Sequence, residues 1–184
     1  MLIAWLAAAS LAGNGVQTLR RSDDPLREAF DAGAGHPRVV VVLTSSCRTC
    51  GPGASALAEL LGARPDVRAM VVWVPILFAD GRPGKRERRA LPDPTARFWD
   101  PDGSVSAAIV AAAGQDEGEV WNVVMLYGPD RVWPDDGAFP VPDWWGTPVI
   151  GAVEPLAAAL DGDPPTESPG ADDGVPDAIA PLDR

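Results

Sequence analysis

The chain has 184 residues and a formal net charge of −11, with 15 basic and 26 acidic side chains. This length suits one domain with tails, and the hydrophobic share of 46% is ordinary for a globular protein. The negative balance argues against nucleic acid as a partner, because binding phosphate groups requires clustered lysine and arginine. The sequence has no run of about 20 apolar residues, so we expect no transmembrane span.

Residues 1–21 are expected to be a signal peptide or another leader. An apolar stretch covers residues 1–12, and its end, Ser10-Leu-Ala12, resembles a cleavage site with small residues. The basic region that usually precedes such a stretch is missing, so an extra N-terminal helix packed on the domain is the alternative. We favour export, and therefore an extracytoplasmic location over a cytoplasmic one.

A helix followed by a buried strand is expected next. Asp23 or Asp24 can cap a helix over residues 22–31, and Pro25 suits its first position. His36-Pro37 then turns the chain. The β-branched run Val39–Leu43 has no polar alternation, which is typical of a strand covered on both faces.

Two cysteines follow this strand directly, at Cys47 and Cys50. Residues 51–62 come next, with apolar side chains at helical spacing. A single pair leaves no room for a disulfide framework, so the cysteines form one local bridge, one dithiol or half of a metal site.

The middle of the chain predicts a second strand and a basic segment. Residues 67–77 are apolar and β-branched, and the intervening helix can act as the crossover that makes the two strands parallel. Residues 78–94 are polar, and the five basic side chains within 82–89 are expected on a solvated loop or short helix.

The remaining elements are predicted from their apolar patterns and turn residues. Helices are expected at 95–100, 105–113 and 149–160, a third strand at 119–127, and a short antiparallel partner strand at 132–133. Residues 134–148 are expected as a loop. Residues 161–184, rich in proline, glycine and aspartate, are predicted to be a disordered acidic tail.

This order of elements, over residues 22–160, resembles the thioredoxin-like superfamily. The segments Phe98-Trp-Asp100 and Val120-Trp-Asn122 are similar to segments of bacterial thioredoxin-like proteins with a CxxC motif. The resemblance implies one α/β domain with a central mixed sheet of about four strands flanked by helices.

The position of the cysteines predicts their roles. Cys47 would face the unpaired amides at the start of a helix, and Arg48 adds a positive charge, so the pKa of this thiol should be lowered. Cys47 is then the attacking thiol and Cys50 the more buried resolving thiol. Ser46 and Thr49 can donate hydrogen bonds to the sulfur or cap the helix.

The chain departs from well-studied thioredoxins in several places. Ser46 stands where a tryptophan precedes the first cysteine. No proline precedes the strand at 119–127, and Thr147-Pro148 follows the expected hairpin. No acid lies in Val39–Leu43 to accept a proton. These differences change the part of the fold that would dock a substrate.

We therefore predict a monomeric thiol–disulfide oxidoreductase that acts on protein thiols or disulfides without a cofactor. The alternative is a non-catalytic binding module whose partner groove is bordered by Trp121, Trp144 and Trp145, since tryptophan suits such surfaces. A third reading is a metallochaperone that uses the cysteine pair. We predict no metal site, because zinc prefers four ligands and the single histidine, His36, suits a turn.

Overall fold

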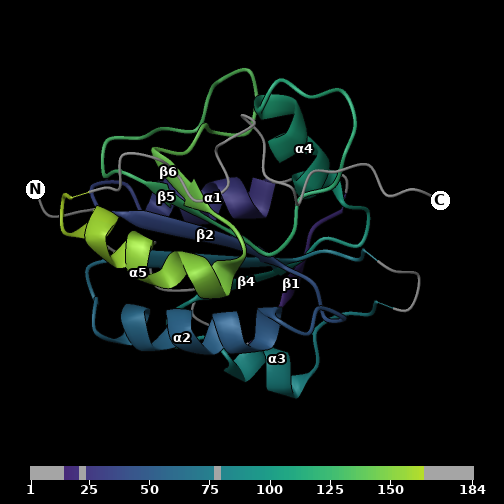
Figure 1. Ribbon diagram of the computed structural model, residues 1–184. Helices are drawn as coiled ribbons and strands as arrows, with labels where there is room; N and C mark the ends of the chain where they lie inside the picture. Colours follow the sequence, from purple (N-terminus) through teal and green to yellow (C-terminus); the bar gives the residue numbers. More distant parts are fainter. Residues whose placement is uncertain (1–14, 21–23, 77–79, 164–184) are drawn as a thin grey trace, which may run out of the picture.

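A mixed six-stranded sheet runs through the molecule, with helices on both of its faces (Figure 1). The computed structural model describes residues 15–20, 24–76 and 80–163. Among these residues the strands are β1 (Gln17–Thr18), β2 (Arg38–Leu43), β3 (Arg68–Trp73), β4 (Ala96–Trp99), β5 (Val123–Tyr127) and β6 (Trp144–Gly146). The helices are α1 (Asp24–Ala32), α2 (Cys50–Gly62), α3 (Lys85–Arg89), α4 (Ser104–Ala112) and α5 (Val149–Leu160).

The strand order is β1-β4-β3-β2-β5-β6, which places β2 near the middle of the sheet. Strands β1, β4, β3 and β2 run parallel to one another, whereas β5 pairs antiparallel with both β2 and β6. All residues of β2 are buried, as expected for an unalternating apolar strand. The predicted α/β class with a mixed sheet is confirmed, but the sheet has six strands instead of about four.

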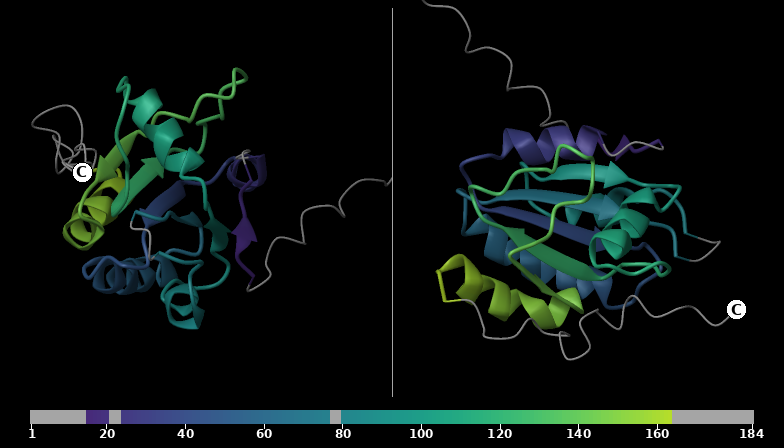
Figure 2. Two further views of the ribbon diagram at one scale, coloured as in Figure 1. Left: turned by 90° about the vertical axis from the view of Figure 1, so that its right-hand side faces the viewer. Right: turned by 90° about the horizontal axis from the view of Figure 1, so that it is seen from above.

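Two hydrophobic cores lie on opposite faces of the sheet. Val39, Val41 and Leu43 of β2 belong to the core under α2 and α5. Val40 and Val42 belong to the core under α1 and α4, as alternation along a strand requires. Figure 2 shows α1 and α4 together on one side of the sheet, and α2 and α5 on the other.

The prediction of a helix over residues 95–100 is wrong, because this segment forms strand β4. Ala96 and Trp99 pair with Met70 and Trp73 of β3, and Phe98 is buried in the core. Aromatic side chains favour a pleated, half-buried surface, and this preference together with pairing outweighs the helical pattern.

The short strand predicted at 132–133 is also wrong. The strand that follows β5 in the chain and pairs antiparallel with it is β6, in which Trp145 pairs with Met125. The Trp133 side chain is 3% exposed and packs edge-on against Phe30, with ring centroids 5.5 Å apart. Trp133 is thus a core residue that reaches the sheet from a loop.

Strand β1 pairs with β4 and lies before residue 22, where the domain was expected to begin. Most of the expected leader, and the acidic tail after Asp163, lie outside the described residues. Within the described part of the chain, no helix is long and apolar enough to cross a membrane.

Helices α2 and α5 approach each other closely at Gly53. A Cβ atom at this position would lie 3.0 Å from the backbone nitrogen of Ile150 and 3.2 Å from Cβ of Val149. The absence of a side chain at Gly53 therefore lets the first turns of α2 pack on the start of α5.

Candidate active site

The cysteine pair lies where β2 ends and α2 begins. Cys47 is bonded to Cys50 in a disulfide, with the two Cα atoms 5.3 Å apart. Helix α2 starts at Cys50, whose amide donates a hydrogen bond to Cys47 Sγ over 3.0 Å. Amides in the first turn of a helix have no partner within the helix, so they can stabilise a nearby sulfur.

The two sulfur-bearing residues differ in exposure. Cys47 is half-buried, whereas Cys50 is 3% exposed and belongs to the core under α2 and α5. Arg48 and Thr49, between them, are exposed. An incoming thiol can therefore reach Cys47 more readily than Cys50.

Thr49 and Ser46, both expected near the sulfur, have different surroundings. Thr49 Oγ1 lies 3.4 Å from Cys47 Sγ, but the Thr49 side chain makes no capping bond to α2. The Ser46 hydroxyl instead donates to Asp80 over 3.1 Å. The expectation that Ser46 bonds the sulfur or caps the helix is corrected, because a carboxylate is the stronger acceptor and lies within reach.

Asp80 holds the segment that leads to Cys47. Its carboxylate accepts hydrogen bonds from the hydroxyls of Thr44, Ser45 and Ser46 at 2.7, 3.2 and 3.1 Å. It also accepts a bond from the amide of Ile76, over 2.9 Å. Asp80 therefore ties the end of β2 to the chain that follows β3.

No role for Asp80 was predicted, although its position after a parallel strand was a usable signal. Parallel strands end at the same edge of a sheet, so polar residues after β3 come close to polar residues after β2. Asp80 follows β3 as Thr44 to Ser46 follow β2. The closeness of Asp80 to Thr44–Ser46 follows from the parallel pairing of β2 and β3, and the CxxC motif gives no information about it.

Asn122 connects the cysteine segment to the start of α5. It lies just before β5 with a positive φ of 57°, and it is 6% exposed. Its side-chain amide donates to Thr49 Oγ1 over 3.3 Å, while Val149 N donates to its carbonyl oxygens at 3.1 and 3.2 Å. Thr147 Oγ1 donates to Asn122 O over 3.0 Å, so Thr147 lies beside Asn122 despite its distance in sequence.

A groove runs beside the disulfide, between the first turns of α2 and helix α3. It has a volume of about 860 Å³, and Cys47, Cys50 and Trp73 form part of its wall. The basic side chains that line it are those of Arg48, Lys85, Arg86 and Arg89. We call this hollow the basic groove. The segment predicted as a solvated loop or short helix thus includes helix α3 and faces the cysteines.

The three tryptophans expected to border a partner groove do not share one surface. Trp144 is 4% exposed and packs in the core under α2 and α5, which corrects its expected exposure. Trp145 is half-buried and packs against the opposite core, because neighbouring strand residues point to opposite faces. Trp121 is half-buried and packs against both cores.

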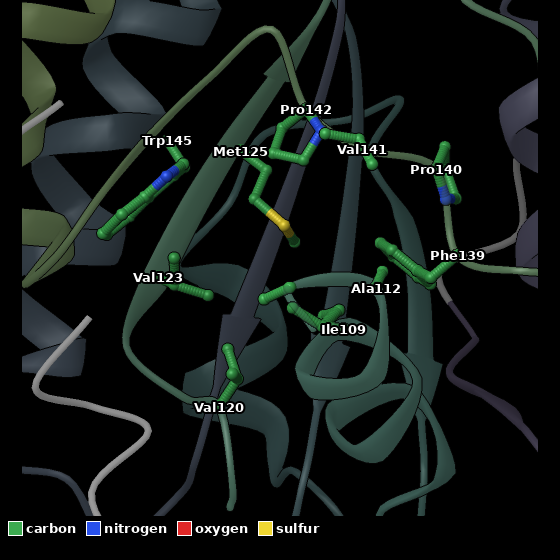
Figure 3. Close-up of a pocket in the computed structure, with 11 residues that line it drawn as sticks. Ile109, Ala112, Val120, Val123, Met125, Phe139, Pro140, Val141, Pro142 and Trp145 are labelled. Carbon is green, nitrogen blue, oxygen red and sulfur yellow. The ribbon is translucent and has the colours of Figure 1, made fainter. Parts of the chain in front are cut away.

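Trp145 lines an apolar pocket of about 240 Å³ (Figure 3). The other walls come from Ile109 of α4, from Met125 of β5 and from residues 139–142. Pro142 and Val141 cover the pocket from the loop before β6. This pocket is lined by a different set of residues from the basic groove.

The described residues contain no group of three or more histidine, cysteine, aspartate or glutamate side chains placed to hold a metal ion. His36, the single histidine, lies in the turn before β2. Its Nε2 is 3.2 Å from an Arg68 guanidinium nitrogen.

No protein-family model and no curated protein matches this sequence. Among solved structures, the chain is similar to a secreted Mycobacterium tuberculosis disulfide oxidoreductase homologous to E. coli DsbE. The identity is 13%, the TM-score is 0.47, and the match covers 72% of this chain and 85% of that one. A likeness of this size carries no argument about function.

Proposed function

We propose that this chain is a thiol–disulfide oxidoreductase of the bacterial thioredoxin-like kind, acting as a monomer on protein thiols or disulfides. The observation that carries the proposal is the Cys47–Cys50 disulfide at the start of α2, with one sulfur accessible and the other buried. A thiolate attacks Cys47 Sγ, Cys50 leaves, and the mixed disulfide is resolved by a second thiol.

Two contacts and a neighbouring positive charge support Cys47 as the attacking thiolate of the reduced protein. The Cys50 amide already donates to its sulfur, the Thr49 hydroxyl lies beside it, and Arg48 is the next residue along the chain. Donors and positive charge stabilise a thiolate more than a thiol. The pKa of the Cys47 thiol should therefore lie below its ordinary value.

The pH dependence of alkylation in the reduced protein tests this proposal. The variant Cys50→Ser leaves Cys47 as the single thiol, and Cys47→Ser leaves Cys50. We expect Cys50→Ser to react with an apparent pKa at least one unit below the reference of about 8.5. The Cys47→Ser control should react slowly at every pH, because Cys50 is buried.

An unshifted or unreactive Cys47 would contradict the proposal. The chain would then be treated as a non-catalytic module built on the same fold. A tight stoichiometric metal complex of the reduced wild-type protein, lost in both cysteine variants, would instead favour the metallochaperone reading.

A further inference from the structure

The basic groove is unusual in a chain whose net charge is −11. Arg48, Lys85, Arg86 and Arg89 are all exposed, and they line one hollow together with the disulfide. Glu87 is the acidic side chain among the residues that line it. A cluster of like charges repels itself, so it suggests a surface adapted to an anionic ligand.

The side chains of these four residues make no hydrogen bond or ion pair with any other residue of the described chain. Other arginines of this protein do pair: Arg64 lies 2.7 Å from Asp161, and Arg97 lies 2.9 Å from Asp93. The nearby Asp80 carboxylate is occupied by the hydroxyls of the segment before Cys47. The charges of the groove thus remain available to a ligand.

The positive surface continues beyond the groove. A second hollow, of about 480 Å³, shares Lys85 and Arg89 with the basic groove and adds Arg88, while Arg97 and Asp93 in its lining pair with each other. A ligand that follows both hollows would pass from the disulfide along the length of α3. This extent suits an extended polypeptide better than a single small anion.

We propose that the basic groove binds an acidic polypeptide segment adjacent to the cysteines of a dithiol substrate. This inference rests on the proposed function and adds its substrate class. Carboxylates of the segment would contact Lys85, Arg86 and Arg89 while the neighbouring thiol reaches Cys47. Charges that lie within about 10 Å of each other are only partly screened by salt. These local contacts can therefore attract the acidic segment even though the net charge of the protein repels it.

The reaction can be written for oxidation of the substrate. One substrate thiol loses its proton, its sulfur attacks Cys47 Sγ, and the Cys47–Cys50 bond breaks with the electron pair leaving on Cys50. The second substrate thiolate then attacks the sulfur joined to Cys47, which forms the substrate disulfide and releases Cys47 as a thiolate. Two electrons pass to the protein, and the two protons of the substrate thiols balance the two new thiolates.

The test measures how fast the oxidised full chain reacts with three dithiol peptides of equal length. Their CxxC segment is flanked by glutamate, glutamine or lysine residues. Flanking charge also changes the pKa of the peptide thiols, so each rate is divided by the rate of the same peptide with dithiodipyridine, an uncharged small disulfide. At low salt we expect the acidic peptide to be favoured about tenfold over the basic one, which is the order expected of three partly screened contacts.

Two variants of equal charge separate local contacts from net charge. The groove variant carries Lys85→Gln, Arg86→Gln and Arg89→Gln, and it leaves Arg48 in place beside the cysteines. The control variant carries glutamine at Arg20, Arg27 and Arg64, which lie outside the groove lining. We expect the preference for the acidic peptide to fall towards one in the groove variant and to persist in the control.

The wild-type protein provides a second measurement that needs no variant. Raising the salt concentration should reduce the acidic-to-basic ratio towards one. A wild-type ratio of one or below, or a ratio that the groove variant keeps, would overturn the inference and leave the proposed function standing. Failure of all three peptides to reduce the disulfide would overturn the proposed function itself, and the inference with it.

Discussion

Two polar residues far from the cysteines in sequence organise the segment around them. The Asp80 carboxylate accepts hydrogen bonds from the hydroxyls of Thr44, Ser45 and Ser46. Asn122 is hydrogen-bonded both to Thr49 and to the start of α5. These bonds join residues that are far apart in sequence. The three hydroxyls lie 34 to 36 positions from Asp80, and Thr49 lies 73 positions from Asn122. Such contacts depend on tertiary structure and are not encoded in a local pattern.

Tyr127, the only tyrosine of the chain, gives a prediction at the scale of one residue. Its hydroxyl is buried and lies 3.4 Å from Met125 Sδ, and burial raises its pKa far above the ordinary value of about 10. The folded state therefore holds this proton where the unfolded state releases it. Its contribution to stability is complete below pH about 10 and is lost as the pH rises further.

In an alkaline titration, we therefore expect the tyrosinate absorbance to appear only when the protein unfolds. Far-ultraviolet circular dichroism measures the unfolding in the same titration. Between neutral and alkaline pH, the variant Tyr127→Phe should lose less of its free energy of unfolding than the wild-type protein does. A tyrosinate midpoint near pH 10 with unchanged circular dichroism would contradict the burial of this hydroxyl.

The residue scale also shows what the sequence could predict of the site. Cys47 and Cys50 were found because their pattern is local: a strand, two cysteines at CxxC spacing and a helix. The sequence did not predict the contact of Asn122 with the cysteine segment, because its positive φ and its bond to Thr49 exist only once β5 lies beside β2. Ser46 was given the wrong neighbour for the same reason.

At the scale of elements, the contact between α2 and α5 sets the position of the cysteine helix. In Gly53→Ala, a methyl group would press on Ile150 N and Val149. We expect overpacking to cost about 1–3 kcal/mol, which exceeds the gain of about 1 kcal/mol in helix propensity. The free energy of unfolding, measured in urea, should fall.

Gly62→Ala is the matched control, because it lies in the same helix and its added Cβ would meet no atom within 4 Å. Here only the propensity changes, and we expect a gain of about 0.5–1 kcal/mol. Equal gains in both variants would show that α5 does not approach α2 at Gly53.

Elements with strong periodicity were predictable, and elements defined by pairing were not. The buried strand β2 and helix α2 follow from the apolar runs around the cysteines. Strand β4 was mistaken for a helix and β6 for a loop, since both are short and acquire their identity from β3 and β5. A short strand contains too few residues to show a periodic pattern of its own, so its structure is decided by the strand with which it pairs.

At the scale of the whole molecule, the excess of acidic groups should oppose folding through repulsion. Salt screens this repulsion, so we expect the melting temperature to rise between about 0.01 and 0.3 M sodium chloride. For a chain of this size, about 1 kcal/mol corresponds to about 2–4 °C. Thermal unfolding followed by circular dichroism measures this change.

Stability and peptide selectivity should thus respond to salt in opposite directions. A falling melting temperature would indicate that the ion pairs, such as Arg64 with Asp161, outweigh the repulsion. That result would not affect the peptide experiment, which compares ratios of rates in the folded protein.

The Asp80 carboxylate has a consequence for the entropy of the proposed disulfide exchange. Its bonds to Thr44, Ser45 and Ser46, and to the Ile76 amide, hold the approach to Cys47 without using either sulfur. When the disulfide opens, the freedom that the chain regains is confined to the single turn between Cys47 and Cys50. In the proposed reaction the bridge could therefore be broken and remade while the surrounding structure keeps its conformation, so each cycle would need little new ordering of the chain.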